Sequence, residues 1–242
     1  MGRTRPLPLA TMLVMLGLAP ALGQQHTWRE PYALETFGMF RSLILSGDFT
    51  PKATLRDVMA KHPTTGVGAV ADARGEITIF DGKLIVSYGK QASHTTTEDE
   101  KAALLAVGTV TAWQSVVVER DVPPDEIETF IAQAAKAHGI KPEVSFPFHI
   151  RGTLLSYAMH VNAAPTNGPH GMGQPIAITV ETKGDVVDGM AAGFYVSPDL
   201  IGVVSHGGTR THCHWVAPDS SSTAHLDQWG LKAGAELLLP QR

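Results

Sequence analysis

Strand-like segments follow one another through the second half of this 242-residue sequence, with no helical segment between them. Runs rich in apolar and β-branched residues occur at 148–152, 154–161, 176–181, 184–195, 211–217 and 223–229. A parallel sheet needs strands that alternate with helices, and this order lacks that alternation. We therefore expect an α+β fold that consists mostly of antiparallel or mixed β-sheets with a few packed helices.

The first half of the sequence predicts helices and a hairpin. Residues 30–62 are expected to be mainly helical, with an interrupting turn at 47–51. The Asp81-Gly82 pair, which stands between alternating apolar residues, predicts a tight hairpin. A further strand is expected within 107–118, and the apolar spacing of residues 125–138 predicts an amphipathic helix.

Three histidines near the end of the sequence have the spacing of a metal site. Alternate side chains of a strand share a face, so a strand at 211–217 would point His212 and His214 the same way. A turn at 218–222 could return the chain as a second strand that carries His225 back beside them. Three neutral imidazoles can hold one divalent metal and leave a fourth position open for chemistry. The plainer alternative is a half-exposed strand face and an unrelated surface histidine.

Charge and composition narrow the classes of partner. The net charge is -4 at pH 7 and the Lys and Arg residues are scattered, which argues against a nucleic-acid partner or a membrane-surface role. The sequence has eleven histidines and one cysteine, a composition that favours metal chemistry. Cys213 has no second cysteine to pair with, and strand alternation places it behind the metal face as a small buried residue.

The first 23 residues are expected to be a cleaved secretory signal peptide. Arg3 and Arg5 precede an apolar run over 7–22, and small residues end that run. The mature chain, residues 24–242, is expected to form a single domain, with possible sub-domains at about 24–140 and 141–242. We therefore expect a secreted or periplasmic protein with no membrane segment in its mature form.

The order of several segments resembles that of the alpha-acetolactate decarboxylase family. The likeness runs from about residue 45 to residue 235, and it includes the steps of two and eleven residues between the three histidines. The segments that carry it are 66–70, 74–77, 80–82, 148–152, 184–194, 207–215 and 224–227.

The resemblance implies a zinc-dependent carbon–carbon lyase that converts 2-acetolactate to acetoin and carbon dioxide. His212, His214 and His225 would hold zinc or another first-row divalent metal, since imidazole suits several of these ions. The metal would act as a Lewis acid on the electron pair that decarboxylation releases. Arg151 would grip the carboxylate of this hydroxy-keto acid, and Glu76 would handle the proton. A homodimer is an expectation from the resemblance alone.

Four features depart from the family pattern. Ala69 stands in place of a threonine, which removes a polar group near the substrate. Arg74 stands in place of an aspartate and would put a cation beside Glu76. Ala224 replaces the glycine before the third metal ligand and would narrow the pocket. Family members bring a second carboxylate from a longer tail, a role that we do not assign to Glu236. A related 2-hydroxy-3-keto acid is therefore an alternative substrate.

Two other functions fit the histidine motif. A non-catalytic, exported metal-binding protein would close the site with a fourth protein ligand, for which His149, His160 and His206 are the candidates. A cupin-like metalloenzyme would need a glutamate three or four residues after the second histidine, where the sequence has Ala217 and Pro218. Catalysis requires instead that Arg151 and Glu76 converge on an open metal position.

Overall fold

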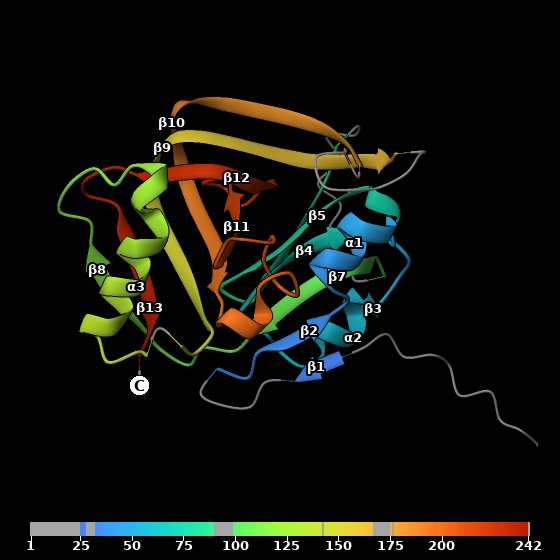
Figure 1. Cartoon of the computed structure of the whole chain (residues 1–242), viewed down its shortest axis with the longest axis horizontal. Coiled ribbons are helices and arrows are strands. Elements are labelled where there is room, and N and C mark those ends of the chain that lie inside the picture. The colour runs from blue at the N-terminus through green and yellow to red at the C-terminus, as the bar shows by residue number, and fades with distance from the viewer. Residues whose placement is uncertain are drawn as a thin grey trace, which may run out of the picture.

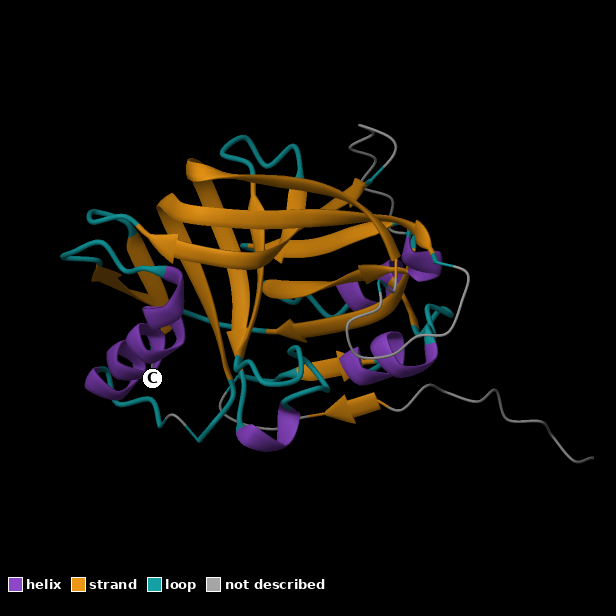
Figure 2. Cartoon of the chain, turned by 45° about the horizontal axis from the view of Figure 1, so that its top comes forward, coloured by secondary structure: helices purple, strands orange, loops and turns teal. Residues whose placement is uncertain are grey.

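The computed structural model describes residues 25–27, 32–89, 99–141, 143–166, 175 and 177–241, so the expected signal peptide at 1–23 lies outside the described residues. The strands gather at the centre of the molecule and the helices lie around them (Figure 2). They form two β-sheets in which every ladder between the named strands is antiparallel. The expected α+β fold with mostly antiparallel sheets is confirmed.

The first sheet is formed by residues before 109. Its strands are β1 (Gln25–Thr27), β2 (Glu35–Phe37), β3 (Ala53–Thr54), β4 (Thr65–Val70), β5 (Gly75–Phe80), β6 (Lys83–Tyr88) and β7 (Lys101–Gly108). They are ordered β1-β2-β7-β4-β5-β6, and β3 pairs with β7. The predicted hairpin is present between β5 and β6, where Asp81 and Gly82 have φ values of 48° and 77°. Two successive positive φ angles are those of the tight turn that matches the twist of the strands.

The second sheet is formed by later strands. They are β8 (Trp113–Val117), β9 (Phe146–Pro165), β10 (Ala177–Tyr195), β11 (Thr211–Val216), β12 (Thr223–Leu231) and β13 (Glu236–Pro240), in the order β10-β11-β12-β9-β13-β8. Because β10 also pairs with β9, the strands β9 to β12 close into a ring. The long β9 and β10 run side by side across the top of Figure 1.

Helices are shorter in the first half than the sequence predicts. Residues 30–62 contain two short helices, α1 (Phe40–Ser46) and α2 (Leu55–Met59), with β2 and β3 around them. Gly47, in the left-handed conformation with φ 62°, ends α1. The expected strand at 107–118 is divided between the end of β7 and β8. The amphipathic helix is confirmed as α3 (Ile127–Ala137), and single 3-10 turns lie at Ala71–Ala73, Pro124–Glu126 and Pro198–Leu200.

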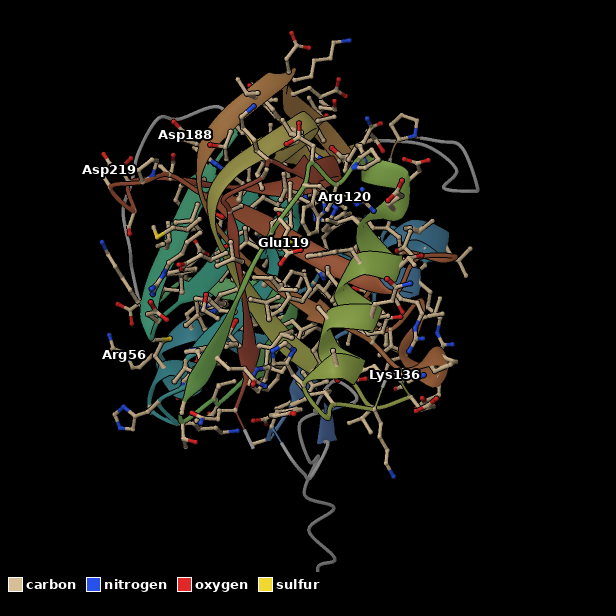
Figure 3. All side chains as sticks on the ribbon, turned by 90° about the vertical axis from the view of Figure 1, so that its left-hand side faces the viewer. Arg56, Glu119, Arg120, Lys136, Asp188 and Asp219 are labelled. Atoms are coloured by element: carbon tan, nitrogen blue, oxygen red, sulfur yellow. The ribbon has the colours of Figure 1, made fainter. Side chains whose placement is uncertain are left out.

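The core between the sheets contains apolar residues from both. Val67, Phe80 and Ile85 of the first sheet pack with Phe194 and Val216 of the second. The other face of the first sheet is covered by α2. The other face of the second sheet is covered by α3, which Figure 3 shows from outside with Lys136 on the helix. Strand alternation from Phe80 therefore turns Glu76 and Thr78 of β5 toward the second sheet.

Candidate metal centre and its pocket

Adjacent strands of the second sheet bring the three C-terminal histidines together. His212 and His214 share a face of β11, and His214 is the direct cross-strand partner of His225 on β12. The Nε2 atoms of His212 and His214 are 3.3 Å apart, and Nδ1 of His225 is also 3.3 Å from Nε2 of His214. The three residues offer ligand atoms that all lie within 4.8 Å of one another. Cys213 points the other way into the core under α3, as its position in the strand predicts.

The spacing and protonation of these nitrogens fit a divalent metal. A tetrahedral site with metal–nitrogen bonds of about 2.0–2.1 Å has edges of about 3.3–3.4 Å. Burial lowers the pKa of His212 to about 3 and holds the pKa values of His214 and His225 well below their ordinary range. Near neutral pH the three imidazoles are therefore uncharged, and neutral imidazole is the form that binds a metal.

Groups from other elements orient these imidazoles. The hydroxyl oxygen of Thr78 on β5 lies 3.0 Å from Nδ1 of His214 and 2.6 Å from the hydroxyl oxygen of Thr223. Nε2 of His206 lies 3.1 Å from Nε2 of His225. Phe40, at the start of α1, covers the group, with its ring edge-on to His212 at a centroid distance of 5.6 Å. The first sheet, the second sheet and α1 thus all contribute to the centre.

Glu76 is the carboxylate that faces the imidazoles from the first sheet. One of its oxygens lies 3.8 Å from Nε2 of His214, and the other accepts a hydrogen bond of 3.2 Å from the backbone N–H of Asn162. The side chain is buried, and this burial raises the pKa of Glu76 to about 8, although His160 and the bond from Asn162 oppose the rise. Glu76 can therefore carry a proton at neutral pH and release it within the pocket.

His160 and Asp227 form a hydrogen-bonded pair beside the candidate metal centre. Nδ1 of His160 on β9 lies 2.9 and 2.8 Å from the two carboxylate oxygens of Asp227 on β12. The register between these strands shifts between Leu226 and Gln228, which leaves Asp227 as the extra residue of a bulge. A bulge re-aims a side chain, and here it turns Asp227 to His160. Neither residue is part of the site that the histidine spacing predicts.

A pocket of about 380 Å³ opens onto the candidate metal centre. Its described lining residues are Phe40, Leu43, Ile44, Gly68, Ala69, Glu76, Leu104, His160, Asn162, Pro175, Ala177, Thr179, Glu181, His206, His212, His225 and Asp227. A second pocket of about 580 Å³ shares His206, His225 and Asp227 with it and extends toward α3. His212 and His225 thus line a cleft large enough for a small molecule, and His214 is buried beside them.

The sequence profile of the alpha-acetolactate decarboxylase family matches residues 38–237. The chain belongs to this family. No curated protein shows significant sequence similarity to the chain.

Solved structures have the same fold as this family member. Alpha-acetolactate decarboxylase from Bacillus subtilis strain 168 is 15% identical and superimposes with a TM-score of 0.71 over 86% of this chain and 85% of that chain. A protein of unknown function from Staphylococcus aureus, described as similar to alpha-acetolactate decarboxylase, is also 15% identical, with a TM-score of 0.65 over 85% of this chain and 84% of that chain. At this identity the likeness shows the fold alone. None of the helices among the described residues is long and apolar enough to cross a membrane.

Arg151, the expected carboxylate clamp, lies away from the imidazoles. Its guanidinium donates to Asp81 at 2.8 Å and lies over the ring of Phe80, and it is not among the described residues that line the pocket. Asp81 follows β5 at the end opposite Glu76, five residues or about 16 Å away. The expectation that Arg151 and Glu76 converge on the metal centre is therefore wrong. The motif placed Arg151 correctly on a strand, but that strand, β9, is 20 residues long, and the part of it that pairs with His225 is at His160, nine residues further on.

Two of the other departures from the family pattern have consequences different from those expected. Arg74 pairs with Glu100 at 2.6 Å. It ends the 3-10 turn before β5 with helical φ and ψ angles, so the alternation of the strand does not carry it to the side of Glu76. Ala224 alternates with His225 and packs in the core under α3, so it does not narrow the pocket. Ala69 does line the pocket, where the expected threonine would have added a hydroxyl.

His149 is excluded as a fourth ligand by its position. Its ring is stacked between Phe80 and Trp113, with centroid distances of 4.3 Å to each, and its Nε2 is bonded to Thr65. His160 and His206 line the pocket, but the group of ligand atoms within mutual reach contains three histidines among the described residues.

Proposed function

We propose that this protein decarboxylates a 2-hydroxy-3-keto acid, 2-acetolactate or a close relative of it, to an acetoin-type product and carbon dioxide. The observation that carries the proposal is the convergence of His212, His214 and His225, at 3.3 Å spacings, beside a pocket that is lined by His212, His225 and Glu76. Membership in the alpha-acetolactate decarboxylase family supports the same reaction class.

The three imidazoles would hold the metal through Nε2 of His212, Nε2 of His214 and Nδ1 of His225. A divalent ion in that position supplies a Lewis acid for the keto and hydroxyl oxygens of the substrate. The hydroxyl of Thr78 fixes the orientation of the His214 ring, and His206 does the same for His225.

Glu76 is suited to the proton transfer that completes the reaction. Loss of carbon dioxide leaves an electron pair on the carbon that carried the carboxylate, and a proton must be delivered there. The raised pKa of Glu76, about 8, keeps that proton on the carboxyl group at neutral pH. The backbone N–H of Asn162 holds the other oxygen, so the proton-bearing oxygen faces the imidazoles.

Apolar side chains give the pocket a wall that suits the methyl groups of such a substrate. Phe40, Leu43 and Leu104 line the side contributed by α1 and the first sheet. This wall excludes water from the carbon that receives the proton and strengthens electrostatic interactions at the polar side.

The test is an acetoin assay on metal-loaded and metal-stripped protein. Protein loaded with zinc and supplied with racemic 2-acetolactate is expected to release acetoin, and chelation is expected to stop the release. Fully loaded protein that forms no acetoin, and no carbon dioxide from other 2-hydroxy-3-keto acids, would leave metal binding as the function. The absence of a fourth described protein ligand favours catalysis over that alternative, because structural sites are closed and catalytic sites keep an open position.

Export remains part of this proposal, since the sequence predicts a signal peptide at 1–23. N-terminal sequencing of the protein from its native host is expected to begin at Gln24. An exported enzyme would meet substrate outside the cytoplasm, so assays should include hydroxy-keto acids related to acetolactate.

A further inference from the structure

The pocket contains an unusual balance of charge for a site that takes an anion. Among its described lining residues there is no arginine or lysine, whereas Glu76, Glu181 and Asp227 are acidic. The substrate class of the proposed function, on which this inference rests, carries a carboxylate. Carboxylates in proteins are usually bound by a cationic side chain, and with no arginine or lysine in the described lining the remaining side chain of that kind is a positively charged imidazole.

His160 is the pocket residue best placed to supply it. Both oxygens of Asp227 lie within 2.9 Å of its Nδ1, and no described residue is hydrogen-bonded to its Nε2. Its ring centroid is 4.9 Å from that of His225, which puts it beside the candidate metal centre. The side chain is 18% exposed, so the ring is reachable from the pocket without being open to bulk water.

The backbone holds His160 in place from both sides. On one edge of β9 its cross-strand partner is His225, and on the other edge it is Glu181 of β10. A residue paired on both edges of its strand cannot shift along the sheet without breaking two ladders. The ring is therefore presented to the pocket in one fixed position.

The charges around His160 distinguish it from the other pocket histidines. Nδ1 of His160 faces a carboxylate oxygen of Asp227 at 2.8 Å, and a second acidic residue, Glu181, is its cross-strand partner on β10. The nearest carboxylate oxygen to a ring nitrogen of His225 is 3.9 Å away, and among the described residues none lies within 4.0 Å of a ring nitrogen of His206 or His212. Near the candidate metal centre, His160 is thus the imidazole that lies closest to a carboxylate, and an opposite charge at hydrogen-bond distance favours the positively charged ring.

We propose that His160, fixed by Asp227, binds the carboxylate of the substrate through its Nε2 and so selects 2-hydroxy acids over neutral 2-hydroxy ketones. In this role it takes the place that the sequence assigned to Arg151. Asp227 is a positioning residue, since it acts through the His160 ring.

The experiment measures binding of an unreactive carboxylate and its neutral counterpart to zinc-loaded protein. The probes are 2-hydroxy-2-methylpropanoate and 2-hydroxy-2-methylpropanamide, titrated by calorimetry, with the zinc content of every sample measured. The wild-type protein is expected to prefer the carboxylate. His160→Gln is expected to weaken carboxylate binding about ten- to a hundredfold, leave amide binding within about twofold, and keep the zinc content. His138→Gln, at the end of α3 outside the pocket, is the matched control and is expected to keep the preference.

Asp227→Asn provides a second, independent variant that keeps the size of the side chain. It is expected to reduce the same preference with zinc retained, because the amide no longer supports the charge on the ring. A carboxylate preference that is unchanged in both variants overturns the proposal, as does a wild-type protein that does not prefer the carboxylate. Zinc loss in His160→Gln to the level of a ligand variant also overturns it, because His160 would then be a metal ligand. If wild-type protein forms no acetoin but shows a carboxylate preference that His160→Gln removes, the proposed decarboxylation fails while this inference holds.

Discussion

The hydroxyl oxygen of Thr78 lies 3.0 Å from Nδ1 of His214, and this contact joins the first sheet to the candidate metal centre on the second. Both side chains are fully buried. The nitrogen that faces His212 and His225 is Nε2, so the threonine occupies the ring nitrogen left over. A partner at that nitrogen fixes the ring and the tautomer, which makes Thr78 part of the centre although it offers no ligand atom.

Thr78→Val is expected to weaken zinc binding about 10- to 100-fold, because the His214 ring loses the partner that orients it. The measurement is competition for zinc with a chromophoric chelator. Thr65→Val is the matched control, since Thr65 is also fully buried and bonds a histidine, His149, at 3.0 Å outside the centre. Equal zinc affinities for the two variants would contradict the role of Thr78 in orienting the His214 ring for metal binding.

His212→Ala is expected to abolish stoichiometric metal binding, because two remaining imidazoles cannot hold the ion tightly. Metal analysis of the purified variant beside the wild-type protein checks this. His138→Ala controls for the loss of an imidazole elsewhere. Full metal content in His212→Ala would contradict the assignment of His212, His214 and His225 as the ligands.

Glu76→Gln is expected to lower the rate of acetoin formation about 10²- to 10⁴-fold while the zinc content stays the same, because the amide cannot deliver a proton. Steady-state kinetics with 2-acetolactate measure the effect. Glu35→Gln, which removes a carboxylate paired with Lys61 outside the pocket, is the control. A rate near that of the wild-type protein would mean that a group other than Glu76 delivers the proton.

Arg151→Ala is expected to leave kcat and KM close to the wild-type values, because its guanidinium is engaged with Asp81 about 16 Å along β5 from Glu76. The half-exposed ion pair should change the free energy of unfolding by no more than about 1 kcal/mol. Kinetics and urea unfolding of the variant give both numbers. A large rise in KM would instead indicate that Arg151 contacts the substrate, as the family resemblance implied.

The stability of the metal-free protein is expected to depend on pH through the buried imidazoles. Burial lowers the pKa of His212 from 6.5 to about 3, so between these values the unfolded chain binds more protons than the folded one and stability falls as the pH falls. Glu76 acts in the opposite direction. Its folded pKa of about 8 lies above the ordinary 4.5, so its contribution is present at low pH and is lost as the pH rises toward 8.

Metal-free Glu76→Gln is therefore expected to lose more stability than metal-free wild type when the pH drops from about 7.5 to about 5.5, because the opposing carboxyl group is gone. Urea unfolding at several pH values measures the two slopes. Parallel slopes would mean that Glu76 is ionised in the folded protein at neutral pH.

Local patterns were sufficient for part of the fold and of the site. The alternation of His212 and His214 on one strand, and the turn that returns His225, follow from the period of a strand and are present in the structure. The Asp81-Gly82 hairpin follows from the turn chemistry of that pair. Residues 30–62 were harder, because the tertiary pairing of β2 and β3 with β7 overrides the helical pattern around α1 and α2.

Contacts that depend on register between distant strands could not be derived from sequence. His160 meets Asp227 because β9 pairs with β12 and a bulge shifts the register there, and neither fact is visible across 67 residues of chain. Arg151 was misplaced for a related reason. It shares β9 with His160, and nothing in the sequence indicates that this strand is 20 residues long, so that Arg151 lies nine residues along it from His160.

The pairing of His214 with His225 across adjacent strands has a consequence for how this centre can diverge. The two residues are held by the ladder between β11 and β12, whereas residues 217–222, which join these strands, lie outside that ladder. Extra residues at the tip would lengthen the loop and leave the ion cage intact, but one residue inserted inside either strand would turn a ligand to the opposite face. The loop at residues 217–222 can therefore change in length and sequence while the paired strands keep the ligands in place, and segments grafted into this loop offer a way to reshape the outer surface of the protein.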